Sequence, residues 1–306
     1  MKKVIVAGAN GFIGTAFVKE LLSHGIEVLC LTKGADTLPE DVVKIEFDLS
    51  NVSELYENHD IKKGYYDTFY NFAWQGSAGD ARIDTRLQLD NAKWSIDLLR
   101  FAKDIGCSRF VGAGSIMEDE TIAACFAQEN RPGEAYIYSD GKLVAHFMGK
   151  SVAAKLDIDF IWVKITNAYG PNEISPRFIN TTLRKIIDNE DLQFTAATQN
   201  YDFVYIDDVA EAFYLIGENG KAFGEYIIGS SDAKPLREFI TEIVMTLAPD
   251  RTPLFGDIPF TGINLPLETF DTEITETVTG FKAKTPFHEG IKNTMRWLKQ
   301  IRGNDD

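Results

Sequence analysis

Short apolar runs alternate with longer amphipathic stretches along the first half of the chain. The runs predict strands at 4–7, 27–31, 43–47, 68–73, 109–113 and 160–164. Between them, apolar residues at helical spacing predict helices at 12–24, 53–58, 87–105 and 138–156. Strands and helices that alternate in this way are typical of a parallel sheet covered by helices on both faces. The pattern therefore predicts an α/β fold of the doubly wound Rossmann type.

The alternation becomes less regular after Gly170-Pro171. Seven of the ten prolines follow residue 171, so the second half is expected to form a smaller, mixed lobe. We expect residues 1–166 to form a dinucleotide-binding domain, to which segments near 201–215 return. Residues 167–306 are expected to form mostly a substrate-binding lobe over the carboxyl edge of the sheet, where open α/β folds bind ligands.

Charge and composition narrow the range of partners. The chain has 306 residues, 44% of them hydrophobic, and 31 basic against 46 acidic side chains give a net charge of −15. An acidic protein of this kind is a poor general partner for nucleic acid or an anionic membrane. No apolar stretch approaches the ~20 residues of a membrane span, and no signal peptide is recognisable, so we expect a cytoplasmic protein. Three scattered cysteines predict neither a disulfide framework nor a metal site.

A glycine-rich turn follows the first predicted strand and opens the first helix. Its spacing is Gly8-x-x-Gly11-x-x-Gly14. Glycine allows a tight turn, a close approach of the backbone to a pyrophosphate, and close packing of the helix on the strand. The turn therefore predicts a dinucleotide site. The expected cofactor-binding residues are Gly8, Gly11, Phe12, Ile13, Gly14, Thr32, Lys33, Asp48, Leu49, Ala73, Tyr138 and Lys142.

The end of the second strand bears on which dinucleotide is bound. A carboxylate there would bind the ribose 2′-hydroxyl of NAD, but this chain has Leu31-Thr32-Lys33. A hydroxyl followed by a cation favours the 2′-phosphate of NADP, with NAD as the alternative, unless Lys33 is only a surface lysine. Asp48, at the end of the third strand, is either an acceptor for the adenine amine or a turn aspartate.

Three polar residues predict an acid–base centre. Tyr138 and Lys142 are four residues apart at the start of a predicted helix, so they share a face. An ammonium group stabilises a nearby phenolate and makes the tyrosine a usable proton donor or acceptor. Ser115 follows a strand and is placed to orient a substrate oxygen. The alternative is a half-buried tyrosine beside a lysine that only covers it.

Motifs spread over nearly the whole chain resemble one family. The sequence is similar to the extended short-chain dehydrogenase/reductases, in the branch of NAD-dependent epimerases and dehydratases that act mostly on nucleotide-diphosphate sugars. Besides the glycine turn and the Ser115, Tyr138 and Lys142 set, the resemblance rests on the following segments: Asn71-Phe72-Ala73, Asn91, Asn167-Ala168-Tyr169-Gly170-Pro171, Phe203-Val204-Tyr205-Ile206-Asp207-Asp208-Val209-Ala210, and the tail from Gly280-Phe281 to Trp297.

The resemblance implies roles for these residues. Tyr138 would be the acid/base, Ser115 would polarise the reacting oxygen, and Lys142 would bind the nicotinamide ribose. Asn167 would face the substrate diphosphate, and Ala73 would approach the cofactor through its backbone. The two long helices at 87–105 and 138–156 would form the interface of a homodimer.

The chain departs from its family at the substrate end. Tyr201 stands where relatives often have an arginine that binds the substrate diphosphate, and Arg177, Lys185 or Arg251 are the candidates to replace it. Trp74 either flanks the sugar pocket or packs in the core. The expected substrate-binding residues are Trp74, Ser115, Asn167, Arg177 and Tyr201.

The same residues serve more than one reaction. Dehydratases of the family have an Asp-Glu pair directly after the catalytic residue, whereas Ile116 and Met117 follow Ser115 here. Glu118 and Asp119 come too late to take that place, which disfavours dehydration. The NADP preference favours a keto-sugar reductase of the 4-ketoreductase type. A nucleotide-sugar epimerase with tightly bound NAD is the alternative, and a non-catalytic nucleotide-sensing module is a third possibility.

Overall fold

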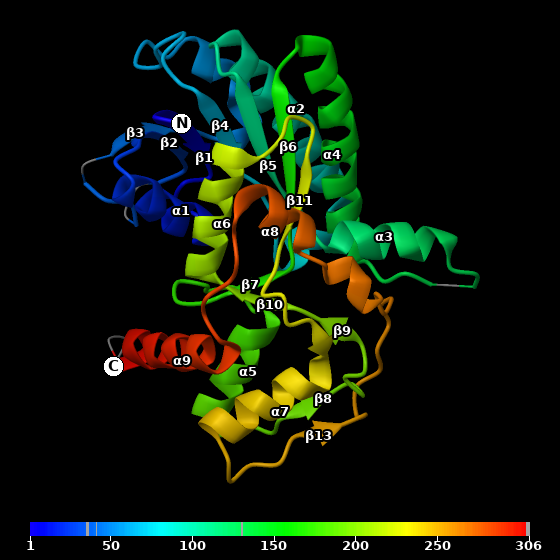
Figure 1. Ribbon diagram of the computed structural model, residues 1–306. Coiled ribbons are helices and arrows are strands. Elements are labelled where there is room, and N and C mark those ends of the chain that lie inside the picture. The colour runs from blue at the N-terminus through cyan, green and yellow to red at the C-terminus, as the bar shows by residue number, and fades with distance from the viewer. Residues whose placement is uncertain (35–36, 41, 130, 304–306) are drawn as a thin grey trace.

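The computed structural model describes residues 1–34, 37–40, 42–129 and 131–303. Seven parallel strands form one sheet in the order β11-β6-β5-β4-β1-β2-β3, which confirms the doubly wound α/β fold (Figure 1). The strands are β1 Lys3–Ala7, β2 Glu27–Thr32, β3 Val43–Glu46, β4 Thr68–Asn71, β5 Arg109–Ser115, β6 Asp159–Ile165 and β11 Glu225–Ile228. The sequence predicts the strands β1 to β6 of this sheet but not β11.

Helices cover both faces of the sheet. Successive side chains of a strand point to opposite faces, so each strand contributes to two cores. Val4 and Val6 of β1 belong to the core beneath α1 and α6, whereas Ile5 and Ala7 belong to the core beneath α2 and α4. The four helices are α1 Phe12–Ser23, α2 Thr85–Asp104, α4 Tyr136–Leu156 and α6 Ile206–Asn219. Both faces are thus buried, as the continuous apolar runs of the strands require.

A smaller lobe follows the carboxyl edge of the sheet. Its helices are α5 Phe178–Ile187, α7 Leu236–Leu247 and α9 Phe287–Gly303. It has two short strand pairs, β8 Gln193–Phe194 with β13 Leu254–Phe255, and β9 Asn200–Tyr201 with β12 Lys234–Pro235. Between the lobe and the sheet, β7 Asn167–Tyr169 pairs with β10 Phe203–Tyr205. A further helix, α8 Glu273–Thr279, packs beside α6 and β11 (Figure 1).

The remaining elements are short helices. They are η1 Leu49–Tyr56, η2 Asp80–Ile83, η3 Leu267–Phe270 and α3 Met117–Phe126. Helix α3 projects from the body of the molecule as an arm, and Phe126 at its end is 80% exposed (Figure 1). The sequence does not predict this helix, because its residues form no apolar stripe.

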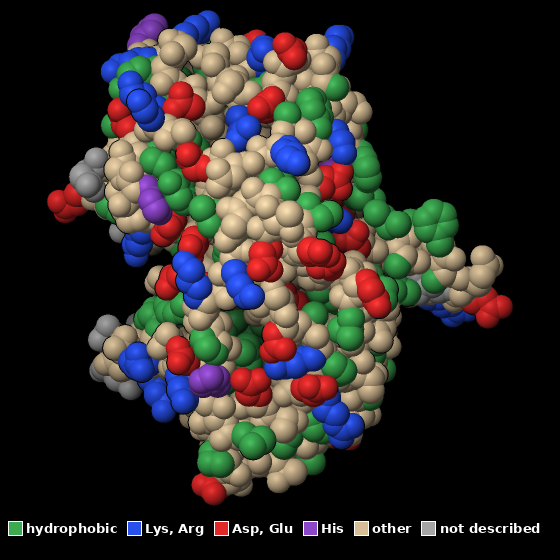
Figure 2. All heavy atoms as spheres, viewed as in Figure 1, with side chains coloured by type: hydrophobic (Ala, Val, Ile, Leu, Met, Phe, Trp, Pro, Cys, Tyr) green, Lys and Arg blue, Asp and Glu red, His purple; other side chains and the backbone are tan. Residues whose placement is uncertain are grey.

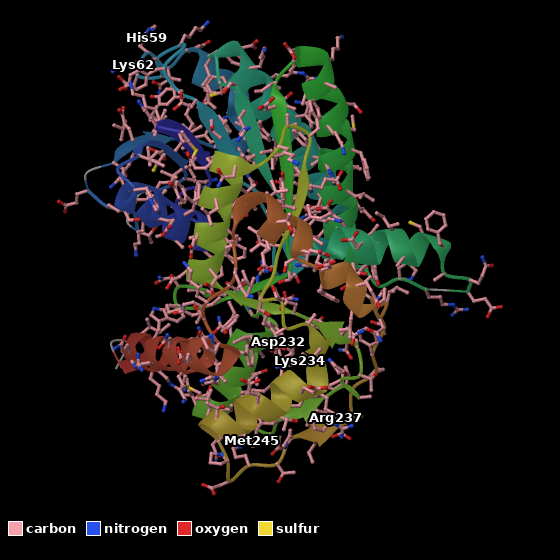
Figure 3. All side chains as sticks on the ribbon, viewed as in Figure 1. His59, Lys62, Asp232, Lys234, Arg237 and Met245 are labelled. Carbon is pink, nitrogen blue, oxygen red and sulfur yellow. The ribbon has the colours of Figure 1, made fainter. Side chains whose placement is uncertain are left out.

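Charged side chains of both signs are interspersed over the face shown in Figure 2. On the small lobe, Lys234 lies beside Asp232 (Figure 3), and its Nζ is 2.8 Å from a carboxylate oxygen of Asp232 and 3.3 Å from one of Glu242. The charge of Lys234 is therefore paired with acidic neighbours. Within the described ranges, no helix has the length and hydropathy needed to span a bilayer.

Candidate active site

The turn between β1 and α1 forms the floor of a cavity of about 620 Å³. Gly8 has a φ of +78°, and a Cβ atom there would lie 2.6 Å from the backbone nitrogen of Ala73. A Cβ atom at Gly14 would overlap the carbonyl oxygen of Gly8. Gly8 and Gly14 therefore accept no side chain, and the turn lies in the wall of the cavity at the start of α1. This arrangement fits the pyrophosphate of a dinucleotide.

The cavity extends from the glycine turn to the predicted acid–base centre. The predicted residues that line it are Gly8, Gly11, Phe12, Ile13, Gly14, Trp74, Tyr138, Lys142 and Arg177. Ala73 lies against the turn through its backbone, as the close approach to Gly8 shows. One continuous cavity that joins phosphate-binding geometry to the tyrosine and lysine is what a bound nicotinamide cofactor requires.

Four residues expected at the adenosine end lie together outside the lining of this cavity. Lys33 Nζ lies 2.9 Å from Asp48 Oδ2, and this hydrogen bond holds the pKa of the Asp48 carboxyl well below its usual range. Thr32 donates its hydroxyl hydrogen to the carbonyl oxygen of Gly34, and Leu49 is buried in the core. A 2′-phosphate contact for Lys33 and an adenine contact for Asp48 remain predictions.

Two amide side chains of α2 hold the loop that follows β4. Asn91 accepts the backbone N–H of Gln75 at 2.9 Å and donates to its carbonyl oxygen at 2.8 Å. Gln88 accepts the indole N–H of Trp74 at 2.7 Å. The indole ring then lies over Lys142, whose Nζ is 3.8 Å from a ring centroid. Trp74 is thus placed beside the lysine in the larger cavity.

A second cavity of about 380 Å³ adjoins the first. Four of the five residues expected to bind substrate line it, namely Ser115, Asn167, Arg177 and Tyr201. The catalytic candidate Tyr138 lines it as well. Tyr138 and Arg177 line both cavities. The phenol therefore lies where a cofactor in one cavity would meet a substrate in the other.

The acid–base candidates occupy a buried environment. Lys142 Nζ donates to the carbonyl oxygen of Ala113 at 2.9 Å and lies 5.9 Å from the ring centroid of Tyr138. Burial raises the pKa of Tyr138, while the positive charges of Arg177 and Arg82 oppose that rise. Burial also lowers the pKa of Lys142 to about 7.

Arg82 is a residue of the second cavity that the sequence does not predict. Its guanidinium carbon lies 4.3 Å from the ring centroid of Tyr138, and the group donates to the carbonyl oxygen of Ser77 at 2.9 Å. In the described part of the chain it forms no ion pair with a carboxylate, and burial lowers its pKa. A half-buried cation that forms no ion pair is suited to an anionic ligand. Arg251 and Lys185 line neither cavity.

The acidic run at the start of α3 does not line either cavity. Asp119 forms an ion pair with Lys164 at 2.9 Å, and Glu118 is buried behind the backbone of Ser115, with which it hydrogen bonds. Burial raises the pKa of Glu120 to about 7, against the opposing charge of Arg82. Glu118 and Asp119 thus point away from the reacting position, as expected from the sequence.

The fold and the paired cavities are those of a dinucleotide-dependent protein of the extended short-chain dehydrogenase/reductase class. The chain belongs to the NAD dependent epimerase/dehydratase family, whose model matches residues 4–229.

Two curated relatives are similar over almost their whole lengths. The chain is 24% identical over 318 residues to CDP-abequose synthase of Salmonella typhimurium, covering 96% of this chain and 98% of the relative. It is 23% identical over 325 residues to dTDP-4-dehydro-6-deoxy-D-allose reductase of a Streptomyces species, covering 97% of this chain and 96% of the reductase.

Solved structures share the fold. UDP-glucose 4-epimerase of Thermotoga maritima, solved with UDP-glucose, superposes with a TM-score of 0.81 at 18% identity, covering 98% of this chain and 99% of the epimerase. The enzyme WbmF of Bordetella bronchiseptica, in complex with NADH, superposes with a TM-score of 0.80 at 20% identity, covering 99% of this chain and 93% of WbmF.

Proposed function

We propose that the protein is an NAD(P)H-dependent oxidoreductase that reduces the 4-keto group of a nucleotide-diphosphate sugar. The observation that carries this proposal is the position of Tyr138 in the wall shared by two cavities. One cavity begins at the glycine turn, and the other holds the two guanidinium groups of Arg82 and Arg177. The names of the two curated relatives, a synthase and a reductase of deoxysugar nucleotides, support the same reaction class.

The environment of Tyr138 suits the reductive direction. Because burial raises its pKa, the phenol is protonated at neutral pH and can give its proton to the oxygen of a ketone as that oxygen gains charge. The Ser115 hydroxyl lines the same cavity and orients that oxygen. A bound reduced nicotinamide would supply the hydride to the carbonyl carbon. Lys142 and the two arginines stabilise the phenolate that remains.

The substrate diphosphate would lie against Arg177 and Asn167, with Tyr201 on the same wall and Arg82 close to the sugar. Residues 1–166, with the later segments that return to the sheet, would bind the cofactor, and residues 167–306 mostly the substrate. Trp74 lies on the cofactor side and would shape the sugar end of the site only through Tyr138, whose ring centroid is 6.0 Å from its own.

The cofactor is the first property to test. Denaturing the purified protein and identifying any released nucleotide, then titrating the stripped protein with NADPH and NADH, separates the alternatives. An empty site that prefers NADPH, followed by turnover of CDP- or dTDP-linked 4-keto-6-deoxy sugars, is the expected result. Tightly held NAD that survives purification would contradict it and favour an epimerase. A cofactor whose redox state no sugar changes would favour a nucleotide-sensing module.

The NADP preference has its own test at the end of β2. Replacing Thr32-Lys33 by Asp-Gly supplies a carboxylate for a ribose 2′-hydroxyl and removes the cation. We expect the ratio of NADPH to NADH affinity to fall by about tenfold or more, since one lost charged contact is worth ~1.4 kcal/mol or more. An unchanged ratio in the same titrations would count against the 2′-phosphate contact.

The protein is also proposed to be a cytoplasmic homodimer that pairs through α2 and α4. These helices pack against each other, and they carry the exposed side chains Leu89, Phe147 and Met148. Exposed apolar side chains on two helices that pack against each other favour contact with a second protein surface.

A further inference from the structure

A buried carboxylate lies directly behind the catalytic serine. Glu118, in the first turn of α3, is 1% exposed. One of its oxygens accepts the backbone N–H of Ser115 at 2.8 Å, and both accept the indole N–H of Trp162 at 3.1 Å. The other oxygen lies 3.0 Å from Nδ1 of His146. Burying a carboxylate costs free energy unless donors surround it, and here they do so from three different elements.

His146 is the partner of this carboxylate on α4. Its ring is stacked between Trp162 and Phe147, with centroid distances of 4.9 Å and 4.8 Å. The side chain is 3% exposed, and its Nε2 lies 3.4 Å from a carboxylate oxygen of Glu225. Packing on both faces fixes the ring, so Nδ1 is held toward Glu118.

The pair connects the two parts of the acid–base centre. Tyr138, Lys142 and His146 follow at intervals of four residues and therefore share one face of α4. Glu118 joins that face, through His146, to the backbone of Ser115. The residue before Ser115 is Gly114, and a Cβ atom there would lie 2.6 Å from Oε1 of Glu118. A side chain at position 114 would therefore clash with the carboxylate.

The charged groups around the pair also have a defined arrangement. Lys142 is buried, and Glu118 is the negative charge that opposes the lowering of its pKa, whereas Arg177 adds to the lowering. Asp119 is neutralised by Lys164 at 2.9 Å, and Glu225 by Lys150 at 2.6 Å. These neighbouring ion pairs leave Glu118 as the carboxylate that faces the lysine.

We propose that Glu118 and His146 are a positioning pair for the proposed reaction: they anchor Ser115 to the helix that carries Tyr138 and Lys142, and they place a buried negative charge near Lys142. The inference rests on the proposed function for its kinetic consequences. Neither residue lines either cavity, so neither is expected to touch the cofactor or the substrate.

The test compares Glu118→Gln with Asp119→Asn, the adjacent carboxylate that faces Lys164 instead. With a CDP- or dTDP-linked 4-keto-6-deoxy sugar, Glu118→Gln should lower kcat by about 100-fold, as a small misplacement of catalytic groups can, with little change in KM. The alkaline limb of its pH profile should move to lower pH, because Lys142 loses the charge that favours its protonated form. Asp119→Asn should retain the kcat and the pH profile of the wild type.

A second pair of variants, at His146, tests the same hydrogen bond from its other end and so distinguishes a loss of positioning from a loss of folding in Glu118→Gln. His146→Phe keeps the stacked ring without a donor, and His146→Gln keeps a donor without the ring. If the hydrogen bond matters for positioning, His146→Phe should resemble Glu118→Gln in kcat, and His146→Gln should restore part of it. Wild-type kcat, KM and pH profile in Glu118→Gln, or equal losses in Asp119→Asn, would overturn the proposal.

A cofactor titration separates this inference from the proposed function. The Kd for NADPH is measured from pH 6 to pH 9 in the wild type and in Glu118→Gln. We expect the variant to lose affinity more steeply as the pH rises, because Lys142 would bind the ribose in its charged form. Absence of sugar turnover in the wild type would contradict only the proposed function. Identical pH dependence in the two proteins would contradict the positioning pair.

Discussion

The Tyr138 phenol lies in the wall that the two cavities share, and its neighbours determine how it can move a proton. Arg82 covers its ring and Lys142 lies one helical turn away, so positive charge is available when the proton leaves. The sequence predicts the tyrosine and lysine because their spacing is local. It does not predict Arg82, because that contact depends on how η2 packs over α4.

The first prediction concerns this phenol. Tyr138→Phe should lower turnover by roughly 100-fold or more, because the general acid is lost while the ring and its packing remain. The affinity for NADPH should stay close to that of the wild type. Steady-state rates and a cofactor titration measure both quantities, with Tyr214→Phe on α6 as the control. Turnover at the wild-type rate would refute the assigned role.

Lys142 gives a prediction for stability. Its pKa falls from 10.5 to about 7 on burial, so the unfolded chain binds more protons between these values and the free energy of unfolding rises with pH. Each pKa unit corresponds to about 1.4 kcal/mol. Lys142→Met should therefore be more stable than the wild type by several kcal/mol near pH 6, and the difference should diminish toward pH 10.5. Thermal unfolding across this range measures it, and equal stability at pH 6 would contradict the prediction.

The elements follow from the sequence to different degrees. Buried parallel strands are short apolar runs, and three long helices carry clear stripes, so the strands β1 to β6 and the helices α1, α2 and α4 were predictable, whereas helix α6 was not predicted. Helix α3 was not, because Glu118, Asp119 and Glu120 interrupt any apolar face, and its burial comes from contacts with α4 and β6. Strand β11 was missed for a related reason: four residues become a strand only beside β6.

The turn between β1 and α1 is the element on which cofactor binding depends. Gly14→Ala would place a Cβ atom against the carbonyl oxygen of Gly8, so the turn must shift. We expect NADPH affinity to fall by about tenfold or more and stability by about 1–3 kcal/mol, typical of an overpacked site. Gly133→Ala is the control, because a Cβ atom there has free space. Wild-type affinity in Gly14→Ala would show that the turn does not hold the phosphates.

The whole molecule is expected to pair through α2 and α4. Met148 on α4 is 54% exposed and Met245 on α7 is 71% exposed, so the two methionines are a matched pair for testing the interface. Met148→Glu should shift a dimer toward monomers, because a buried interface does not accept an unpaired charge. Met245→Glu, on the small lobe (Figure 3), should not. Sedimentation velocity distinguishes the two, and a dimer unaffected by Met148→Glu would exclude this face.

The path of the chain between the sheet and the small lobe has a consequence for evolution and engineering. After β6 the chain forms α5 in the lobe, returns for α6 and β11, forms α7 in the lobe, returns for α8, and ends with α9 (Figure 1). No single cut separates the two parts. A new sugar specificity could not be acquired by exchanging one contiguous segment, as in modular proteins. It would have to come from point substitutions and loop changes within a shared scaffold. Chimeras with relatives should therefore exchange individual loops or residues and not one contiguous half of the chain.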